Sequence, residues 1–371
     1  IRKVDPENAR DRRAFSALPF QLYRNCPNWV PPLASEMADV FDRRRHPFYR
    51  HSQADFFLAQ QDGQVVGRTA VLHNRRFCDY HQEATAFFYY FDCIDDETVA
   101  SALFAAAGDW ARARSLTSLL GPKGFLRSSG AGLLVDGFEY PPALGIPYNY
   151  NYYEKLLLST GFKKESDFLS GFLNKSQSLS ARIHEIAEKV TQKGSFTVRC
   201  FHTRAEVRSW YRRLQTAHDQ AFQNNPNFYP MTDEEANWSG ETFLKVIDPR
   251  LIKLIMKGDQ IAGFIFAYRD ISRALQCTGG KLWPFGWIAI LLEMNRSKVV
   301  NLNGMGFLPS FQGLGANALL YTEVEKTLQE VDFDLADLVQ IDERNTKSIA
   351  DMENIGIRWS KRHRTYRKAI I

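Results

Sequence analysis

The chain has 371 residues, 44% of them hydrophobic, and a formal net charge of +5. These values indicate a globular protein of two or three domains, whose mild positive charge suits an anionic ligand better than a nucleic acid. No apolar run approaches the ~20 residues that cross a bilayer, the polar N-terminal stretch is not typical of a signal peptide, and the five scattered cysteines form no C-x-x-C pair. We therefore expect a cytoplasmic protein without a metal ion or a nucleic-acid partner, and peripheral contact with a membrane stays open.

The first half begins with a helix-rich lead-in over residues 1–50. A β-hairpin follows, because Asp62-Gly63 is a turn pair between two apolar runs. A strongly aromatic strand then leads into a helix whose acidic start, Asp95 to Glu97, suits the helix dipole. The expected ranges are strands 54–59, 64–72, 84–93, 119–125 and 167–172, helices 95–114 and 151–160, and a loop-rich stretch 128–148.

A charged helix over residues 175–193 is expected to link the first half to a second one. The second half has its own hairpin, with a turn at Gly258-Asp259, and ends in an alternation of strands and helices. The expected ranges are strands 196–200, 251–256, 260–268, 335–341 and 359–369, helices 204–222, 316–328 and 345–354, and a strand that begins at Val299.

The two halves repeat each other. Phe56–Leu72 parallels Leu251–Ala267, and both contain an apolar run, a tight turn, and then Gln, an aliphatic residue and Gly. Asn151–Phe162 parallels Asn345–Ile357, as Asn, a short helix and Gly followed by an apolar residue. Because both correspondences have nearly the same offset in the same order, they indicate a tandem repeat of one fold.

A glycine-rich turn after residues 299–308 is the strongest local motif. It reads Gln312-Gly313-Leu314-Gly315-Ala316-Asn317 and connects a buried strand to a helix with apolar residues at helical spacing. Such a turn can hold an anion, because glycines let backbone N–H groups converge beside the positive end of a helix. No Walker loop and no dinucleotide fingerprint are present.

This loop resembles the pyrophosphate loop of the GNAT superfamily of acyl-CoA N-acyltransferases, which usually reads Gln/Arg-x-x-Gly-x-Gly/Ala; Asn317 stands at the last small position. With the repeat, the chain looks like a tandem GNAT protein: an α/β fold with a mixed sheet in each of two lobes. The resulting boundaries are a lead-in (1–50), an N-terminal lobe (51–174), a linker helix (175–195) and a C-terminal lobe (196–371). The acidic residues before the first-half helix indicate that the N-terminal lobe has lost its acyl-CoA loop.

The resemblance implies transfer of an acyl group from acetyl-CoA or a longer acyl-CoA to a primary amine on a small molecule or a lipid. It implies that backbone N–H groups from Gln312 to Asn317 hold the pyrophosphate and that a bulge near Gly306 frees an oxyanion donor. The cofactor-binding residues expected on this basis are Phe307, Leu308, Gln312, Gly313, Leu314, Gly315, Ala316, Asn317 and Asn345.

The acid and base are less clear from the sequence. Asp342, at the end of the strand after the loop helix, is the candidate base, although a solvated strand end is the plainer explanation. The family often places a tyrosine acid in the last helix, where this chain has Met352, so Tyr366 is the candidate substitute. His202 and His218 remain alternatives.

The apolar, Trp-containing stretch Lys281–Leu292 is unusual for a compact lobe of this kind. It is too short to span a bilayer, so it suits a membrane interface, the wall of an acyl-chain channel, or plain packing. Either functional alternative would favour a long acyl chain and a lipid amine. Two competing functions stay open: a non-catalytic acyl-CoA-binding or regulatory protein, and a Fem-like aminoacyl transferase.

Overall fold

The structure is a computed structural model that describes residues 1–176, 179–330 and 332–370. It divides into two compact units, each built from separate stretches of the chain. Unit 1 comprises Ile1–Phe168, Ser272–Ile290 and Lys361–Ile371, and unit 2 comprises Leu169–Ile271 and Leu291–Ser360. Three elements run from one unit into the other: β7 (Lys163–Asn174), α10 (Gly286–Arg296) and β13 (Arg358–Ala369).

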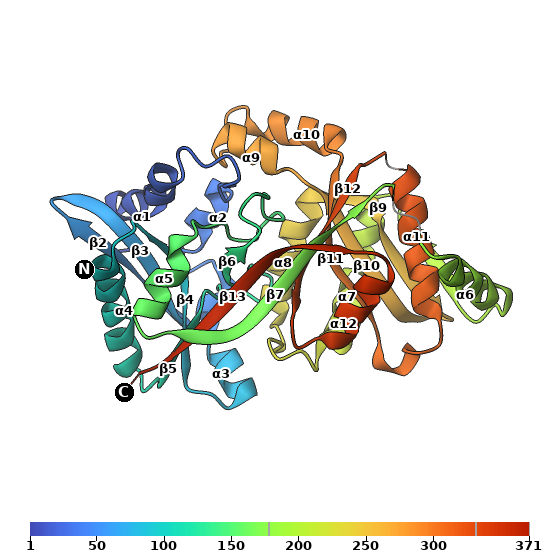
Figure 1. Ribbon diagram of the computed structural model, residues 1–371, viewed down its shortest axis with the longest axis horizontal. Helices are drawn as coiled ribbons and strands as arrows, with labels where there is room; N and C mark the ends of the chain where they lie inside the picture. The colour runs from blue at the N-terminus through green and yellow to red at the C-terminus, as the bar shows by residue number, and fades with distance from the viewer. Residues whose placement is uncertain (177–178, 331, 371) are drawn as a thin grey trace. The chain divides into compact units, whose positions relative to one another are not determined.

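Unit 1 contains one mixed sheet with the order β1-β2-β3-β4-β5-β13, in which β6 also pairs with β13, together with the helices that pack on it (Figure 1). All these pairs are antiparallel except β4 with β5. The strands are β1 (Arg2–Lys3), β2 (Gln53–Gln61), β3 (Gln64–His73), β4 (Thr85–Cys93), β5 (Ser118–Gly121) and β6 (Leu133–Asp136). The helices are α1 (Ala9–Leu22), α2 (Ala34–Asp39), η1 (Pro47–Arg50), α3 (Arg75–His81), α4 (Glu97–Arg112), α5 (Tyr152–Ser159) and α9 (Ser272–Thr278).

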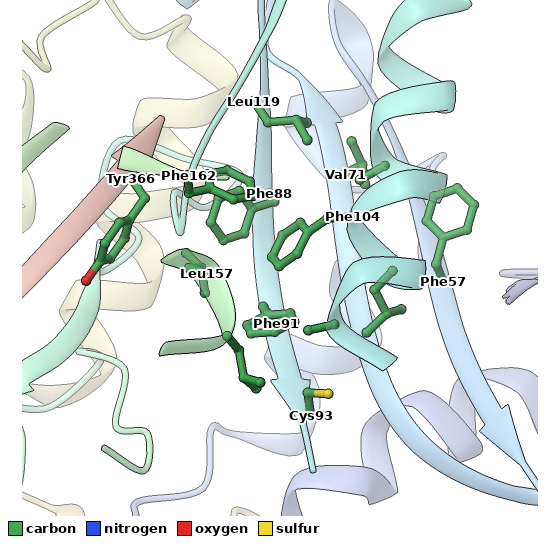
Figure 2. Packing of buried hydrophobic residues seen from close by; sticks show 14 of the residues in the cluster. Phe57, Val71, Phe88, Phe91, Cys93, Phe104, Leu119, Leu157, Phe162 and Tyr366 are labelled. Atoms are coloured by element: carbon green, nitrogen blue, oxygen red, sulfur yellow. The ribbon is translucent and has the colours of Figure 1, made fainter. Parts of the chain in front are cut away.

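The core of unit 1 forms where α4 packs on the sheet. The Phe104 ring lies 5.1 Å from that of Phe88 and 4.7 Å from that of Phe162, and all three side chains are buried. Figure 2 shows these rings gathered with Phe91 and Leu157, with Tyr366 of β13 at the margin of the cluster. Edge-on aromatic contacts of this kind stabilise a core beyond the area that they bury.

Unit 2 repeats this plan with the order β12-β11-β10-β9-β8, in which only β11 with β12 is parallel, and the second half of β7 lies beside β12. Apolar residues of the sheet alternate between a face covered by α6 and α11 and a face covered by α7 and α8. The strands are β8 (Thr197–Cys200), β9 (Ile247–Lys257), β10 (Gln260–Arg269), β11 (Val299–Phe307) and β12 (Leu335–Asp342). The helices are α6 (Ala181–Gln192), α7 (Arg204–Phe222), α8 (Asp233–Val246), η2 (Pro309–Phe311), α11 (Ala316–Glu330) and α12 (Thr346–Asn354).

The repeat predicted from the sequence is confirmed. Both halves have the hairpin, then a strand, a helix and a parallel strand, as β2–β5 and as β9–β12. The repeat extends to a bulge: β4 carries one residue more than β3 between Tyr89 and Asp92, as β11 does against β10. Tyr90 takes a φ of +50° there. A tyrosine in this left-handed region is uncommon.

The units differ from the four consecutive segments predicted. The lead-in belongs to unit 1, because β1 pairs with β2 and α1 buries Phe15 and Leu18. Residues 361–371, predicted with the C-terminal lobe, join unit 1 because β13 pairs with β5. The predicted linker contains α6, which packs against α11 in the core of unit 2; residues 177 and 178 of that linker lie outside the described residues. Both units are discontinuous in the sequence, and the strand that completes unit 1 comes from the far end of the chain.

Candidate active site

The candidate site is organised around β11, which lies between β10 and β12. β11 pairs with β12 only as far as Leu302, opposite Leu338, and the two parallel strands then separate. Its pairing with β10 continues to Phe307 but is interrupted by a bulge between Leu302 and Met305. Gly304, in this bulge, has a φ of +125°, which favours glycine. The bulge therefore coincides with the point where β11 leaves β12, and the facing backbone edges beyond that point are not paired with each other.

The bulge lies upstream of the position predicted from the sequence. Gly306 pairs in register with Phe264, and glycine suits this position because an added Cβ would lie 3.0 Å from the Phe264 ring and 3.2 Å from Ala221. The Leu308 N–H donates to the Ala262 carbonyl at 2.9 Å, so it is not available as an oxyanion donor. Because alternate N–H groups of a strand point to opposite sides, the N–H of Phe307 points toward the gap beside β11.

The glycine-rich turn lies directly after β11 and η2. Gly313 and Gly315 have φ values of +75° and +78°, so the two left-handed residues bracket Leu314, which is 50% exposed. Within the described part of the chain, no group accepts a hydrogen bond from the backbone N–H groups of residues 313–317. These donors meet the start of α11, a helix of 15 residues. Unsatisfied N–H groups and the helix dipole together favour an anion here.

Helix α6 limits the space beside this turn. A Cβ added to Gly315 would lie 3.0 Å from Cγ2 of Ile186 and 3.2 Å from Cγ2 of Val190. Figure 1 shows α6 alongside α11. Gly313, in contrast, would have no atom within 4 Å of an added Cβ. Gly315 is therefore needed for close packing and for its backbone angle, and Gly313 for its backbone angle alone.

Lys347 is a contributor that the sequence analysis missed. This exposed residue in the first turn of α12 donates from Nζ to Oε1 of Gln312, whose Nε2 in turn donates to the Phe307 carbonyl at 3.0 Å. The contact brings a positive charge to the turn and holds Gln312 in place. Nothing in the sequence signals this contact, because it joins residues 35 positions apart.

Asp342, the predicted base, is a fully engaged carboxylate. It is 3% exposed and accepts from the backbone N–H and Nε of Arg344 at 3.0 and 2.9 Å. Its other oxygen accepts from the second Arg344 nitrogen at 2.6 Å and from Nδ2 of Asn227 at 2.8 Å. A carboxylate with both oxygens so occupied suits the positioning of Arg344 and Asn227 better than the removal of a proton from an amine.

We expect Asp342→Asn to lower the free energy of unfolding by about 1–3 kcal/mol, because the Arg344 contacts lose their charge assistance. Chemical denaturation measures this change, and Asp334→Asn, on an exposed side chain, is its control. Affinity for acyl-CoA should stay within about threefold of the wild type, since among the described residues no hydrogen bond or ion pair joins Asp342 to residues 312–317. Unchanged stability together with lost turnover would instead restore Asp342 as the base.

Two other predicted residues are engaged in local structure. Asn345 caps α12, with its Oδ1 accepting from the Ser348 N–H at 3.2 Å. Tyr366 is fully buried in unit 1, and its hydroxyl donates to Oε1 of Glu154 at 2.7 Å. Burial, followed by this hydrogen bond, raises the pKa of Tyr366. Its role as the acid stays a prediction, since Tyr366 and the turn belong to different units.

An apolar pocket lies in unit 2 beside the bulge. Leu302, Gly304 and Met305 of β11 line it together with Leu338 of β12, so it begins where the two strands separate. The rest of its lining is mostly aliphatic, with four polar residues, and comprises Leu173, Asn174, Lys175, Leu179, Ile265, Tyr321, Val324, Glu325, Leu328, Gln329, Met352 and Ile355. Such a cavity fits a flexible hydrocarbon chain.

Tyr321 is the phenol of this pocket and was also missed. It is 5% exposed, and burial raises its pKa. Its hydroxyl interacts with Asp351 and Asn317, and burial likewise raises the pKa of Asp351. Met352, which we expected from the resemblance at the position of a tyrosine acid, lines the same pocket. The pocket therefore does contain a protonated phenol, but it comes from α11 rather than α12.

Unit 1 fills the equivalent helix start with its own carboxylate. Oδ1 of Asp96 accepts from the N–H groups of Thr98 and Val99 at 2.7 and 3.3 Å. The N–H groups that unit 2 leaves open are thus occupied by Asp96 in unit 1. The loss of the pyrophosphate site from the first copy stays a prediction. Among the described residues, no group of three His, Cys, Asp or Glu side chains could hold a metal ion.

Comparison with known proteins identifies two proteins of similar sequence and a solved structure of similar fold. Protein YghO of Escherichia coli (strain K12) is 28% identical over 370 residues, which cover 98% of this chain and 94% of that protein. Bacterial ceramide synthase of Caulobacter vibrioides (strain NA1000 / CB15N) is 27% identical over 368 residues, which cover 96% of this chain and 94% of the relative. No protein-family model matches the chain.

Among solved structures, a tandem GNAT protein from the clavulanic acid biosynthesis pathway matches with a TM-score of 0.57 and 12% identity. The match covers 100% of this chain and 98% of that one. It agrees with the repeated hairpins, the paired bulges and the parallel strand that leaves its neighbour in unit 2. The chain therefore has the tandem GNAT fold.

Proposed function

We propose that the chain is an N-acyltransferase that takes a long acyl group from an acyl-CoA and transfers it to the amine of a lipid-like acceptor. The observation that carries the proposal is the sequence of features along β11. The backbone N–H groups of residues 313–317, here called the anion cradle, follow the end of the strand. An unpaired edge of β11 faces the separated β12, and an apolar pocket starts at the bulge. An acyl-CoA has the same order of parts: a pyrophosphate, a pantetheine arm with amides, and an acyl chain.

Each part then has a physical role. Backbone N–H groups of residues 313–317 would bind the pyrophosphate, and Lys347 would add charge near it. The unpaired edge of β11 would pair with the pantetheine amides as an added strand does. The Phe307 N–H, directed toward the same gap, would stabilise the oxyanion of the tetrahedral intermediate.

The reaction is attack of a neutral amine on the thioester carbon. The C–N bond forms, the C–S bond breaks, the nitrogen loses a proton and the leaving thiolate gains one. Tyr321 and Tyr366 are the two phenols to compare as the proton donor. The relative from Caulobacter vibrioides whose name describes a ceramide synthase supports a long acyl chain and a lipid amine.

The test is thiol release from acyl-CoAs of increasing chain length, with and without a long-chain amino alcohol as acceptor. We expect turnover only when both substrates are present, and a KM for acyl-CoA that falls as the chain lengthens. Product analysis should show one amide per thiol released. Tight acyl-CoA binding without any turnover would contradict the proposal and favour a non-catalytic acyl-CoA-binding protein. Transfer from aminoacyl-tRNA alone would favour a Fem-like enzyme.

A further inference from the structure

The segment Leu282–Leu292, here called the aromatic segment, contains seven of the twelve large hydrophobic residues that are exposed among the described residues. Trp283 is 81% exposed, Phe285 is 73% exposed and Trp287 is 47% exposed. α10, which begins within it, has no buried residue. Leu282, Ile288, Leu291 and Leu292 are also exposed. Single exposed apolar residues are ordinary, but a cluster of them in one short segment is not.

The base of the segment is firmly held within unit 1. Nε2 of Gln276, on α9, donates to the carbonyls of Pro27 and Trp29 at 2.7 and 3.0 Å. The Gly280 carbonyl accepts from the Ala34 N–H at 2.9 Å, and an added Cβ on Gly280 would meet the Pro32 carbonyl at 2.1 Å. The exposed tip is closed by Trp287, whose backbone N–H donates to the Leu282 carbonyl at 2.9 Å. The aromatic side chains are thus presented from a built support rather than from a loose loop.

Basic residues border the segment in the sequence. Arg273, Lys281 and Arg296 are exposed, and within the described residues no ion pair joins any of them to a carboxylate. Glu293 is the one acidic residue between Arg273 and Arg296, and it is only partly exposed. Tryptophan prefers the headgroup level of a bilayer, and exposed cations prefer an anionic leaflet.

We propose that the aromatic segment docks the protein onto an anionic lipid bilayer, with Trp283, Phe285 and Trp287 entering the headgroup region. No helix in the described ranges has the length and apolarity to cross a bilayer. Docking at the surface by a short aromatic helix with flanking cations needs neither property. The proposal goes beyond acyl transfer and does not depend on the identity of the donor.

The experiment is flotation of the full chain with vesicles of phosphatidylcholine containing phosphatidylglycerol, and with vesicles of phosphatidylcholine alone. We expect binding to the anionic vesicles, weakened by salt. The triple variant Trp283→Ser/Phe285→Ser/Trp287→Ser should lower the partition coefficient at least about tenfold. Neutralising Arg273, Lys281 and Arg296 to Gln should lower it by about fivefold for each charge. The matched control, Tyr80→Ser/Leu158→Ser, removes exposed apolar side chains elsewhere and should leave it unchanged.

Quenching of wild-type tryptophan fluorescence by lipids with brominated acyl chains needs no variant and should be strong on anionic vesicles. Equal vesicle binding by wild type and the triple variant would overturn the proposal. So would wild-type protein that ignores vesicles but forms a dimer that the triple variant cannot form, because the occupant would then be a second copy. Thiol release with a short-chain acyl-CoA in vesicle-free buffer, compared between the two proteins, separates a failure of docking from a failure of acyl transfer.

Discussion

Gly313→Asp should abolish most of the affinity for acyl-CoA, with a rise in Kd of at least about thirtyfold. The substitution places a carboxylate in open space beside the unpartnered N–H groups of residues 313–317. Two unit charges about 5 Å apart repel by about 3 kcal/mol near a protein surface, and salt screens part of this. Calorimetry with CoA and with a long-chain acyl-CoA measures the loss, which should be similar for both ligands because both carry the pyrophosphate.

The control for this variant is Gly63→Asp in the β2–β3 turn. Gly63 has a φ of +78°, close to the +75° of Gly313, and it too has no atom within 4 Å of an added Cβ. The backbone strain of the two substitutions should therefore match, and only the cradle variant should lose affinity. Gly315→Asp is a poorer choice, since its side chain would also displace Ile186. If Gly313→Asp binds acyl-CoA as tightly as the control, the cradle is not a pyrophosphate site.

Val324→Trp should shorten the acyl chain that the protein prefers. Val324 lies on α11 in the pocket lining, only partly buried, so a larger side chain can extend into the cavity. The added ring would displace roughly three methylene groups of a bound chain, at ~0.8 kcal/mol each, or about 2 kcal/mol in all. We expect the affinity for long-chain acyl-CoA to fall about thirtyfold while the affinity for CoA stays unchanged.

Two further variants serve as controls for Val324→Trp. Lys326→Trp places the same ring on an exposed position of α11 and should change neither affinity. Val324→Ala enlarges the pocket and should preserve or lengthen the preferred chain. Circular dichroism and thermal melts check that all three variants fold. A Val324→Trp protein that retains full discrimination by chain length would mean that the acyl chain binds elsewhere.

The repeated hairpins and the glycine turn could be predicted from the sequence because their signals are local. Asp62-Gly63 and Gly258-Asp259 mark turns by residue type, and α7 begins and ends at the predicted residues, Arg204 and Phe222. The Gly-x-Gly spacing likewise reports backbone angles, which the structure shows at Gly313 and Gly315. Signals of this kind depend on residues that are close in the sequence, and tertiary contacts do not change them.

The members of the candidate site that depend on tertiary contacts could not be predicted. Asp342 was chosen for its place after a strand, but the neighbouring Arg344 occupies it. Tyr321 and Lys347 reach the pocket and the turn only because α11 and α12 pack on the same sheet. The bulge was assigned to Gly306 because glycine can serve either a bulge or close packing, and the sequence does not distinguish the two uses.

The interleaving of the two units has a consequence for synthesis on the ribosome. β13 supplies Tyr366 to the core of unit 1 and pairs with β5, although more than 200 residues separate these strands along the chain. Unit 2 needs nothing beyond Ser360, so it can close first. Unit 1, most of which is synthesised first, is therefore completed last. Until residues 361–369 emerge from the ribosome, the core of unit 1 lacks Tyr366 and one edge of its sheet stays open to other strands.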